Sequence, residues 1–424
     1  MIKILNFNEV GREQILTRNE KSADIAAVVT EIIDDVIANG DEALIRYAAK
    51  FDKAQLTSLQ VTEDEIQQAL EEVEPRFIEV LKKAAANITK FHEKQKRTSF
   101  IINDTPGVVM GQKVIPVERA GLYIPGGTAA YPSTVLMNAI PAHIAGVQDI
   151  VMVSPTGADG KIPAVILAAA KIAGVTKIFK TGGAQAIAAL AYGTQTIPKV
   201  DKIVGPGNAY VAEAKRQVFG KVSIDMIAGP SEILIVSDGN SNPAHLAADM
   251  LSQAEHDRMA TAVLVTDSAK LASEVAAELE LQVEKLARKE IAKTSIDNNG
   301  KIIVCDDLSA AIEVANEIAP EHLELCVDNP FDYLDKIRNA GSVFMGRNCP
   351  EALGDYLAGP NHTLPTSGTA RFSSPLSVDD FVKKTQFTYY TREALADVAQ
   401  DVAYFANLEG LTAHAKSAVI RTEE

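Results

Sequence analysis

Residues 149–192, DIVMVSPTGADGKIPAVILAAAKIAGVTKIFKTGGAQAIAALAY, decide the fold. Two short strand-like runs, 149–157 and 176–183, alternate with two alanine-rich segments that are long enough to be helices, 162–174 and 184–192. Short runs rich in Ile, Val and Phe that alternate with helices are typical of β–α units, whose parallel strands are buried on both faces. The stretch therefore predicts a parallel sheet that is covered by helices.

The same alternation continues on both sides of this stretch. GLYIPGG precedes it at 121–127, and VDKIVGPGN with a helical segment follows at 200–220. A second series begins after Pro230, in which EILIVSDG, TAVLVTD and KIIVCDD are separated by helical segments. We therefore expect an α/β protein with two doubly wound parallel-sheet modules, each an incomplete Rossmann-like fold, and a ligand site in the cleft between them.

The two ends of the chain have a different pattern. Residues 20–100 are polar with apolar residues at helical spacing, where Ser22 can cap a helix that runs toward Gly40 and Asp41 can cap the next. The chain after Ser377 is also predicted to be helical to its end. A unit of about 50 residues is too small for a stable core of its own, so we expect this C-terminal arm to pack on something else.

The composition excludes some classes of partner. With 41 Lys and Arg against 56 Asp and Glu, the net charge of −15 disfavours nucleic acid or an anionic membrane as the main partner. The apolar runs are shorter than the ~20 residues of a membrane span, and the start of the chain lacks a secretory pattern, so we expect a cytoplasmic protein. The three cysteines have no metal-binding or redox spacing and are interpreted as structural thiols, with a Cys nucleophile of the aldehyde-oxidising type as the less favoured alternative.

Three glycine-rich turns connect strands to helices in the first module. They are Pro125–Gly127, Gly182–Gln185 and Gly205–Asn208. Such turns can present backbone N–H groups to a pyrophosphate at a helix N-terminus. None has the G-x-G-x-x-G dinucleotide fingerprint, because Tyr210 stands where the third glycine would be in the nearest match. Each turn alone is explained as a tight connection, but three in one module favour a phosphate-rich ligand.

Histidine and acidic residues that could bind a metal ion or act in catalysis lie in four short stretches. They are SQAEH at 252–256, PEHL at 320–323, GDY at 354–356 and LTAH at 411–414. Gln253 and His256 are three residues apart in a helical segment and so share a face. They can offer one oxygen and one imidazole nitrogen to a divalent metal ion. Asp355 and His414 are the candidates for the remaining ligands.

Taken singly, these residues also have ordinary interpretations. Glu321 and His322 follow a proline and could simply begin a helix, and adjacent side chains usually point to different sides of an element. Asp355 could be a turn aspartate, and His414 could be a surface residue of a helical tail. The remaining histidines outside the motifs, His92, His143 and His245, are assigned no role.

Together, the motifs resemble those of the histidinol dehydrogenase family. The similarity runs in order through GLYIPGG, GGAQAIAALAYGT, VDKIVGPGNAYVAEAKRQV, DMIAGPSEILI, LSQAEHD, APEHLEL, GSVFMG, PEALGDYLAGPNHTLPT and LTAHAKSAV. It covers the chain from about residue 20. The resemblance implies a zinc- and NAD-dependent oxidoreductase that converts L-histidinol to L-histidine through L-histidinal with two NAD⁺ and water, at the end of histidine biosynthesis.

The resemblance also implies roles for individual residues. The implied Zn²⁺ ligands are Gln253, His256, Asp355 and His414. The implied catalytic acid–base pair is Glu321 and His322. The implied NAD-binding residues are Tyr123, Gln185 and Asn208. The implied substrate-binding residues are Ser231, His362 and Glu409, together with the metal ligands and the acid–base pair.

Assembly and domain division follow from the same resemblance. It implies an intertwined homodimer in which the C-terminal arm completes the active site of the partner subunit. The predicted domains are a metal- and substrate-binding α/β domain of residues 1–120 plus 231–375 with a helical N-terminal region, a Rossmann-like NAD-binding domain of residues 121–230, and a helical C-terminal dimerisation arm of residues 376–424.

The residue types suit an alcohol-to-acid oxidation on chemical grounds. Two hydride transfers with a hydration between them need a base near neutral pH, which an imidazole supplies, and a carboxylate that activates water. A metal ion could hold the substrate as a template. Three alternatives stay open: a paralogue that oxidises another small polar alcohol with NAD, a zinc hydrolase with Glu321 as its base, and, least favoured, a non-catalytic dimeric scaffold.

Overall fold

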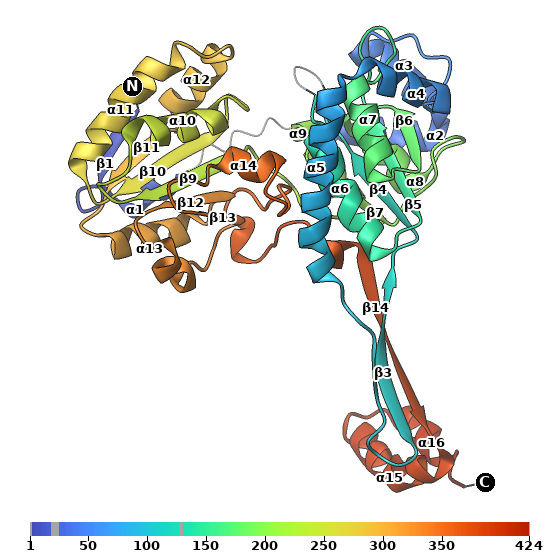
Figure 1. Cartoon of the computed structure of the whole chain (residues 1–424). Coiled ribbons are helices and arrows are strands. Elements are labelled where there is room, and N and C mark those ends of the chain that lie inside the picture. Colours follow the sequence, from blue (N-terminus) through green and yellow to red (C-terminus); the bar gives the residue numbers. More distant parts are fainter. Residues whose placement is uncertain (1, 18–24, 127–129, 424) are drawn as a thin grey trace. The chain divides into compact units, whose positions relative to one another are not determined.

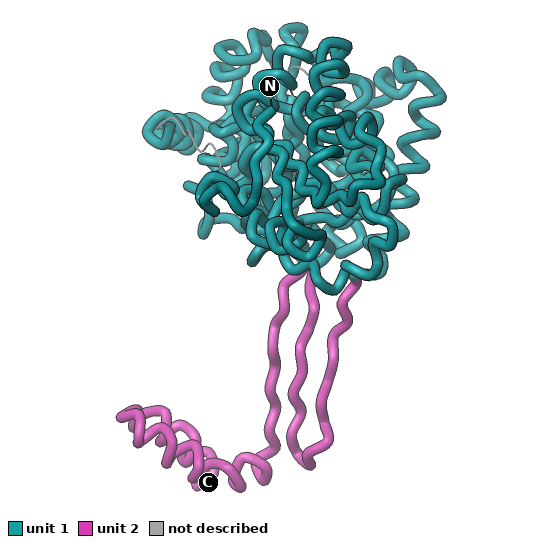
Figure 2. The backbone as a smooth tube through the Cα atoms, turned by 90° about the vertical axis from the view of Figure 1, so that its left-hand side faces the viewer, with its two compact units in different colours: residues 1–95, 118–381 teal, residues 96–117, 382–424 magenta. Residues whose placement is uncertain are grey.

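The computed structural model describes residues 2–17, 25–126 and 130–423 (Figure 1). They form two compact units, coloured separately in Figure 2. Unit 1 comprises residues 1–95 and 118–381, and unit 2 comprises residues 96–117 and 382–424. Ser22 and Gly127, for which the sequence predicts a helix cap and a glycine-rich turn, lie outside the described residues.

The first module of unit 1 is a parallel five-stranded sheet with the order β6-β5-β4-β7-β8. Its strands are β4 (Arg119–Tyr123), β5 (Asp149–Ser154), β6 (Lys177–Lys180), β7 (Lys202–Val204) and β8 (Ser223–Ile224). Its helices are α6 (Pro132–Ala145), α7 (Ala164–Ala173), α8 (Gly183–Tyr192) and α9 (Ala209–Val218). The predicted β–α alternation is confirmed here.

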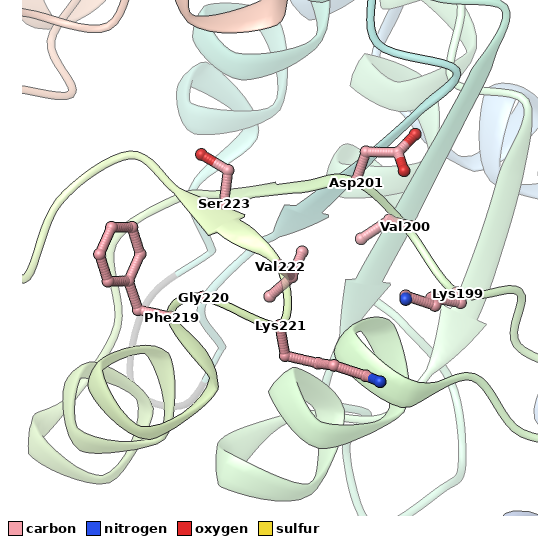
Figure 3. A pocket seen from close by; sticks show the side chains of 8 residues that line it. All are labelled: Lys199, Val200, Asp201, Phe219, Gly220, Lys221, Val222 and Ser223. Atoms are coloured by element: carbon pink, nitrogen blue, oxygen red, sulfur yellow. The ribbon is translucent and has the colours of Figure 1, made fainter. Parts of the chain in front are cut away.

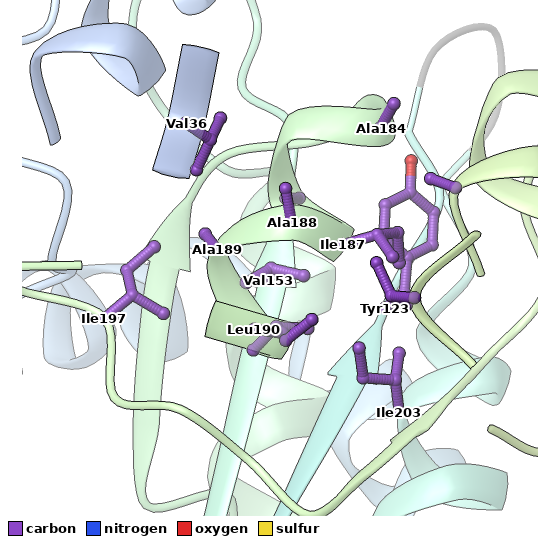
Figure 4. Close-up of a cluster of buried hydrophobic side chains, with 14 of the residues drawn as sticks. Val36, Tyr123, Val153, Ala184, Ile187, Ala188, Ala189, Leu190, Ile197 and Ile203 are labelled. Carbon is purple, nitrogen blue, oxygen red and sulfur yellow. The ribbon is translucent and has the colours of Figure 1, made fainter. Parts of the chain in front are cut away.

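The core of this module shows why its sequence is so rich in alanine. Every residue of α8 from Ala184 to Ala191 is buried, because the helix lies between the sheet and the N-terminal helix α2. Figure 4 shows Ile187 and Leu190 of α8 among side chains of the strands, such as Val153 and Ile203. Small alanine side chains let the helices approach the sheet closely on this face.

The N-terminal helices pack around the first module. They are α2 (Ala26–Asn39), α3 (Asp41–Tyr47), η1 (Ala48–Asp52), α4 (Glu63–Glu72), α5 (Pro75–His92) and η2 (Glu93–Gln95). α2 contacts α8 and α9, α4 contacts α7, and α5 contacts α6 and α7. The predicted division groups residues 1–120 with the second module instead. β1 (Lys3–Asn6) and α1 (Arg12–Leu16) do contact that module, and Asn87 of α5 donates to the Leu357 carbonyl at 2.7 Å. The division by function stays a prediction.

The second module is a parallel six-stranded sheet with the order β1-β11-β10-β9-β12-β13. Its further strands are β9 (Glu232–Ser237), β10 (Thr261–Thr266), β11 (Lys301–Val304), β12 (His322–Cys326) and β13 (Ser342–Met345). Its helices are α10 (Pro243–Ala254), α11 (Ala269–Val283), α12 (Lys289–Asn299), α13 (Leu308–Ile318) and α14 (Glu351–Tyr356). The short helices η3 (Pro330–Lys336), η4 (Thr369–Arg371) and η5 (Val378–Phe381) complete unit 1.

Alternate side chains of these strands serve two separate cores, as expected for a doubly wound sheet. Ile233 and Ile235 of β9 pack with α10, α11 and α12, whereas Leu234 and Val236 pack with α13 on the other face. The two doubly wound parallel sheets predicted from the sequence are thus present. No helix in the described ranges is both long enough and apolar enough to cross a membrane.

Unit 2 corrects one expectation. β14 (Val382–Tyr390) pairs antiparallel with β3 (Val108–Pro116), which also pairs antiparallel with β2 (Phe100–Ile102). The prediction of an entirely helical chain after Ser377 is therefore wrong for residues 382–390. The predicted helical arm is formed by α15 (Arg392–Leu408) and α16 (Thr412–Val419), which pack against each other.

Candidate functional site

Polar side chains converge at the amino ends of strands in the six-stranded sheet. Ser231 directly precedes β9, and His322 is the first residue of β12. Gln253 lies in the last turn of α10, and His256 lies between α10 and β10. Ligands of open parallel sheets usually bind at the carboxyl ends of the strands. This cluster lies at the opposite edge, a position that the strand pattern alone does not reveal.

Glu321 and His322 are both held by one residue of the neighbouring strand. The backbone N–H of Glu232 donates to Glu321 Oε2 at 2.9 Å, and the backbone carbonyl of Glu232 lies 2.9 Å from His322 Nδ1. A carbonyl can only accept, so Nδ1 carries the proton of the neutral ring and Nε2 is left as a base. The prediction that the pair could begin a helix is wrong, because β12 begins at His322.

Burial sets the protonation states of this pair. Burial lowers the pKa of His322 to about 4, although the nearby Asp355 opposes the change. Burial also raises the pKa of Glu321 well above its usual value, against the hydrogen bond from Glu232. The imidazole of His322 is therefore neutral at pH 7 with Nε2 able to accept a proton, and the raised pKa makes the ionised form of Glu321 a stronger base than an exposed carboxylate.

The predicted metal ligands of unit 1 lie in the same cluster. Gln253 is fully buried, and its Nε2 lies 3.4 Å from His256 Nδ1. Asp355 Oδ1 lies 3.5 Å from His362 Nδ1. Burial would raise the pKa of Asp355, but the hydrogen bond with His362 and the charges of the nearby imidazoles, His322 and His256 among them, lower it to about 2. The structure thus brings together an amide, three imidazoles and a carboxylate.

Glu351 is a member of this cluster that the sequence interpretation missed. Its Oε1 lies 3.8 Å from His322 Nε2, and its Oε2 accepts from Ser252 Oγ at 3.2 Å. Burial, followed by the charge of Asp355, raises the pKa of Glu351 to about 9. The available signal was the spacing of Glu351 and Asp355, four residues apart in PEALGDY, which puts both carboxyl groups on one face of α14.

Two buried oxygens of the cluster have no hydrogen-bond partner among the described residues. They are Gln253 Oε1 and Glu351 Oε1. Buried acceptors are normally paired, so two such atoms in one cluster indicate a bound group. Donor atoms of His322, Glu351 and Asp355 also lie within 4.8 Å of one another, a spacing that could hold a metal ion. This triad shares Asp355 with the predicted ligand set but differs from it in the other two members.

The predicted NAD-binding residues lie at the carboxyl ends of the five-stranded sheet. Tyr123 is the last residue of β4, and its hydroxyl accepts from the Gly183 N–H at 3.1 Å. Gln185 is buried in the first turn of α8. Asn208 caps α9, where its Oδ1 accepts from the N–H groups of Tyr210 and Val211 at 3.0 and 3.2 Å. Two helix N-termini therefore lie at the edge where a dinucleotide is expected.

Two predicted substrate and metal residues belong to unit 2. Glu409 is the C-terminal cap of α15 and His414 lies in α16. Both residues are exposed. The roles assigned to them stay predictions.

A hollow of about 290 Å³ lies elsewhere on the first module (Figure 3). It is lined by residues 199–201, which precede β7, and residues 219–223, which lead into β8. This is the amino edge of the five-stranded sheet, whereas Tyr123 and the glycine-rich turns lie at its carboxyl edge. The hollow is therefore not the predicted cofactor site.

Two of the three cysteines do not fit the nucleophile alternative. Cys305 and Cys326 are buried free thiols. Burial raises the pKa of Cys305 to about 12, and burial also raises the pKa of Cys326. Because the thiolate is the reactive form, both residues are interpreted as structural.

Two doubly wound sheets, glycine-rich turns and a buried cluster of carboxyl and imidazole groups are typical of an α/β oxidoreductase. A family model for histidinol dehydrogenase matches residues 16–422. The chain belongs to the histidinol dehydrogenase family, which confirms the resemblance drawn from the motifs.

Individual relatives agree with this assignment over nearly their whole length. The chain is 56% identical to the histidinol dehydrogenase of Clostridium acetobutylicum over 404 residues, which cover 95% of this chain and 94% of that protein. It is 57% identical to that of Bacillus cereus over 423 residues, which cover 100% and 96%. The crystal structure of histidinol dehydrogenase from Elizabethkingia anophelis is similar with a TM-score of 0.95 and 40% identity, covering 100% of this chain and 98% of that one.

Proposed function

We propose that this chain oxidises L-histidinol to L-histidine through L-histidinal, with two NAD⁺ as hydride acceptors and one water, in histidine biosynthesis. The observation that carries the proposal is the buried pair Glu321 and His322, which is fixed on the backbone of Glu232 beside the two unpaired oxygens of Gln253 and Glu351. Family membership names the substrate. The arrangement supplies the two proton acceptors that a four-electron oxidation needs.

In this proposal, His322 Nε2 accepts the proton of the alcohol and then that of the hydrated aldehyde. Its Nδ1–H bond to the Glu232 carbonyl fixes both the ring and its tautomer. Glu321 activates the water that adds to the aldehyde, since a carboxylate of raised pKa is a stronger base than an exposed one. The low exposure of both side chains keeps bulk water from the reactive aldehyde.

The residues of unit 1 fit a zinc ion held by Gln253, His256 and Asp355, with His414 as the fourth ligand. The fit rests on the unpaired, buried Gln253 Oε1, which a cation would satisfy, and on the mixed nitrogen and oxygen donor set that zinc accepts. When bound, zinc would act as a Lewis acid and template for the substrate. His322, although near the same carboxylates, is then free to serve as the base.

For the cofactor, we propose that the turns at Gly182–Gln185 and Gly205–Asn208, with Tyr123, bind NAD. Support comes from their position at the N-termini of α8 and α9, where backbone N–H groups favour phosphate oxygens. The substrate would be held by Ser231, His362 and Glu409 together with the acid–base pair and the metal ligands.

We further propose a cytoplasmic homodimer in which α15 and α16 deliver Glu409 and His414 to the site of the partner subunit. Tyr404, Phe405 and Leu408 of α15 are 69%, 66% and 73% exposed in the single chain. Large exposed apolar side chains on one helix are typical of an interaction surface. A second copy of the chain would bury them and would complete a metal site that has three ligands in unit 1.

The reaction is tested by its stoichiometry. With excess NAD⁺, each histidinol consumed should yield two NADH and one histidine, and histidinal should not accumulate. One NADH with release of the aldehyde would contradict the proposal. A paralogue would reduce NAD⁺ with a different alcohol in a substrate screen, and a zinc hydrolase would form no NADH.

The metal is tested separately. Removal of zinc by a chelator should abolish NADH formation, and added Zn²⁺ should restore it. His256→Ala should lower the zinc content and abolish activity while the circular dichroism spectrum stays that of wild type. Full activity in metal-free protein would overturn the zinc assignment.

A further inference from the structure

We propose that the buried ion pair of Lys215 and Asp225 positions the glycine-rich turn Gly205–Asn208 for the cofactor. Lys215 lies on α9 and Asp225 directly follows β8. Neither residue belongs to the acid–base cluster or to the predicted metal site. The inference rests on the proposed function, because it takes this turn to bind NAD.

The pair is almost completely removed from solvent. The Lys215 and Asp225 side chains are 2% and 1% exposed, and Lys215 Nζ contacts Asp225 Oδ1 directly. A buried ion pair rarely stabilises a protein more than apolar side chains of the same size would, because both ions lose their hydration. Net stability is therefore a weak reason for two charges at this position, and the groups that they bind provide a better one.

Both ions bind the backbone of Gly205, the first residue of the turn. Lys215 Nζ donates to the Gly205 carbonyl at 3.0 Å, and the Gly205 N–H donates to Asp225 Oδ2 at 2.7 Å. The two polar groups of one peptide residue are thus fixed from opposite sides by opposite charges. Charge-assisted hydrogen bonds are stronger and shorter than neutral ones, so the pair holds the turn more firmly than a neutral pair would.

The position of Gly205 matters for its neighbours. Its φ of +115° is open only to glycine, and a Cβ there would lie 2.1 Å from the Tyr123 carbonyl oxygen. The turn backbone therefore packs directly on the end of β4. Three residues further on, Asn208 caps α9. A shift of Gly205 would displace Tyr123 or Asn208, both of which are assigned to NAD.

Asp225 also fixes the start of the segment that leads to Ser231. Its Oδ1 accepts from the Met226 N–H at 2.6 Å, and its own N–H donates to the Ile203 carbonyl at 3.1 Å. One carboxylate thus binds the backbone at the turn and at the beginning of residues 225–231. The pair acts as a positioning unit; it is not assigned any contact with substrate or cofactor.

The variants Lys215→Met and Asp225→Asn test this role, because each removes one charge at nearly constant volume. We expect the KM for NAD⁺ and the Kd for NADH, measured by its fluorescence, to rise at least tenfold. The KM for histidinol and the zinc content should stay within twofold of wild type. A purely structural role would change the unfolding midpoint without this selective change in NAD affinity.

Lys202→Met is the matched control. Lys202 is the first residue of β7, and the turn Gly205–Asn208 follows the other end of this strand. Lys202 Nζ pairs with Asp380 Oδ1 at 3.3 Å, and the two side chains are 9% and 26% exposed. The pair lies at the amino end of the strand, away from Gly205. This variant should unfold more easily than wild type but keep its KM for NAD⁺.

A measurement on the wild-type protein covers variants that fail to fold. If the pair preorganises the turn, the hydrogen-bonded amides of Gly205 and Met226, which Asp225 binds, and of Tyr210 and Val211, which Asn208 caps, exchange slowly with deuterium even without NAD⁺. Fast exchange that slows only on addition of NAD⁺ overturns the inference, as does an unchanged NAD⁺ affinity in folded Lys215→Met. If wild-type protein binds no NAD⁺, the proposed function is refuted instead. The exchange measurement without cofactor then still tests whether Lys215 and Asp225 position the turn.

Discussion

Glu321 and His322 are neighbours in sequence, yet their contacts predict different roles. His322 should serve both oxidation steps, whereas Glu321 should act mainly in the hydration and second step. Glu321→Gln should therefore slow histidinal oxidation much more than histidinol oxidation, and His322→Ala should slow both by roughly 10²–10⁴-fold. The two half-reactions can be followed separately by adding histidinol or histidinal with NAD⁺. Equal losses in both steps for both variants would refute this division.

His92, to which no role was assigned, is a fully buried part of a hydrogen-bond network in unit 1. Its Nδ1 lies 2.7 Å from Gln95 Oε1, and its Nε2 lies 3.4 Å from Asn361 Nδ2. An amide N–H₂ can only donate, so this arrangement suits the neutral ring and conflicts with the imidazolium. Burial accordingly lowers the pKa of His92 below its usual value of 6.5.

This lowered pKa predicts a pH-dependent stability. Below about pH 6.5 the unfolded chain binds a proton at His92 that the folded chain does not, so the free energy of unfolding falls as the pH falls. Wild type should therefore lose more stability between pH 7 and 5 than His92→Gln, by at most about 1.4 kcal/mol per pH unit. Urea unfolding at several pH values measures the difference, with His245→Gln as a control for an exposed histidine. Parallel pH profiles for wild type and His92→Gln would contradict the argument.

Sequence periodicity predicts a helix or strand well when the residues of that segment alone show which of its faces are buried. The Ile- and Val-rich runs of β5, β9 and β10 are buried on both faces, and their composition shows this directly. β14 was missed because its pairing partner β3 lies more than 260 residues earlier in the chain. Its alternation of Thr, Phe and Tyr with polar residues was the local signal of a strand.

The site was predicted less completely than the fold, for a physical reason. The motifs supplied Gln253, His256, His322 and Asp355, and the structure brings them together. Their position at the amino edge of the second sheet depends on strand register and on the placement of α14, neither of which is a local property. The contacts of His322 and Glu321 with the backbone of Glu232 depend on the same register between β9 and β12.

The turn after β7 allows a test of backbone geometry at the scale of one element. Gly205 and Gly220 both have positive φ, +115° and +96°, but a Cβ at Gly205 would meet the Tyr123 carbonyl whereas one at Gly220 meets nothing within 4 Å. Gly220→Ala should cost about 1–2 kcal/mol for the unfavourable φ alone. Gly205→Ala should cost more than ~3 kcal/mol, because β4 must also move. Urea unfolding compares them; equal losses would show that the close approach to Tyr123 is unimportant.

At the scale of the whole molecule, unit 2 has only a small hydrophobic core with which to be stable on its own. Its buried helix contacts are formed by Ala403, Ala406 and Ala415, with Val419 packed beside them. The larger apolar side chains of α15 are exposed instead. Such a unit gains stability by covering that face, which a second copy of the chain would do.

The dimer can be tested by mixing two inactive variants, His256→Ala and His414→Ala, in a joint unfolding and refolding. If His414 acts in the partner subunit, a mixed dimer has one site with both substitutions and one site with neither. Random pairing makes about half of the dimers mixed, so activity should return to about a quarter of the wild-type level. Each variant refolded alone is the control and should stay inactive. If the mixture also stays inactive while mixed dimers are shown to form, for example with differently tagged chains, His414 serves its own subunit and the shared site is refuted.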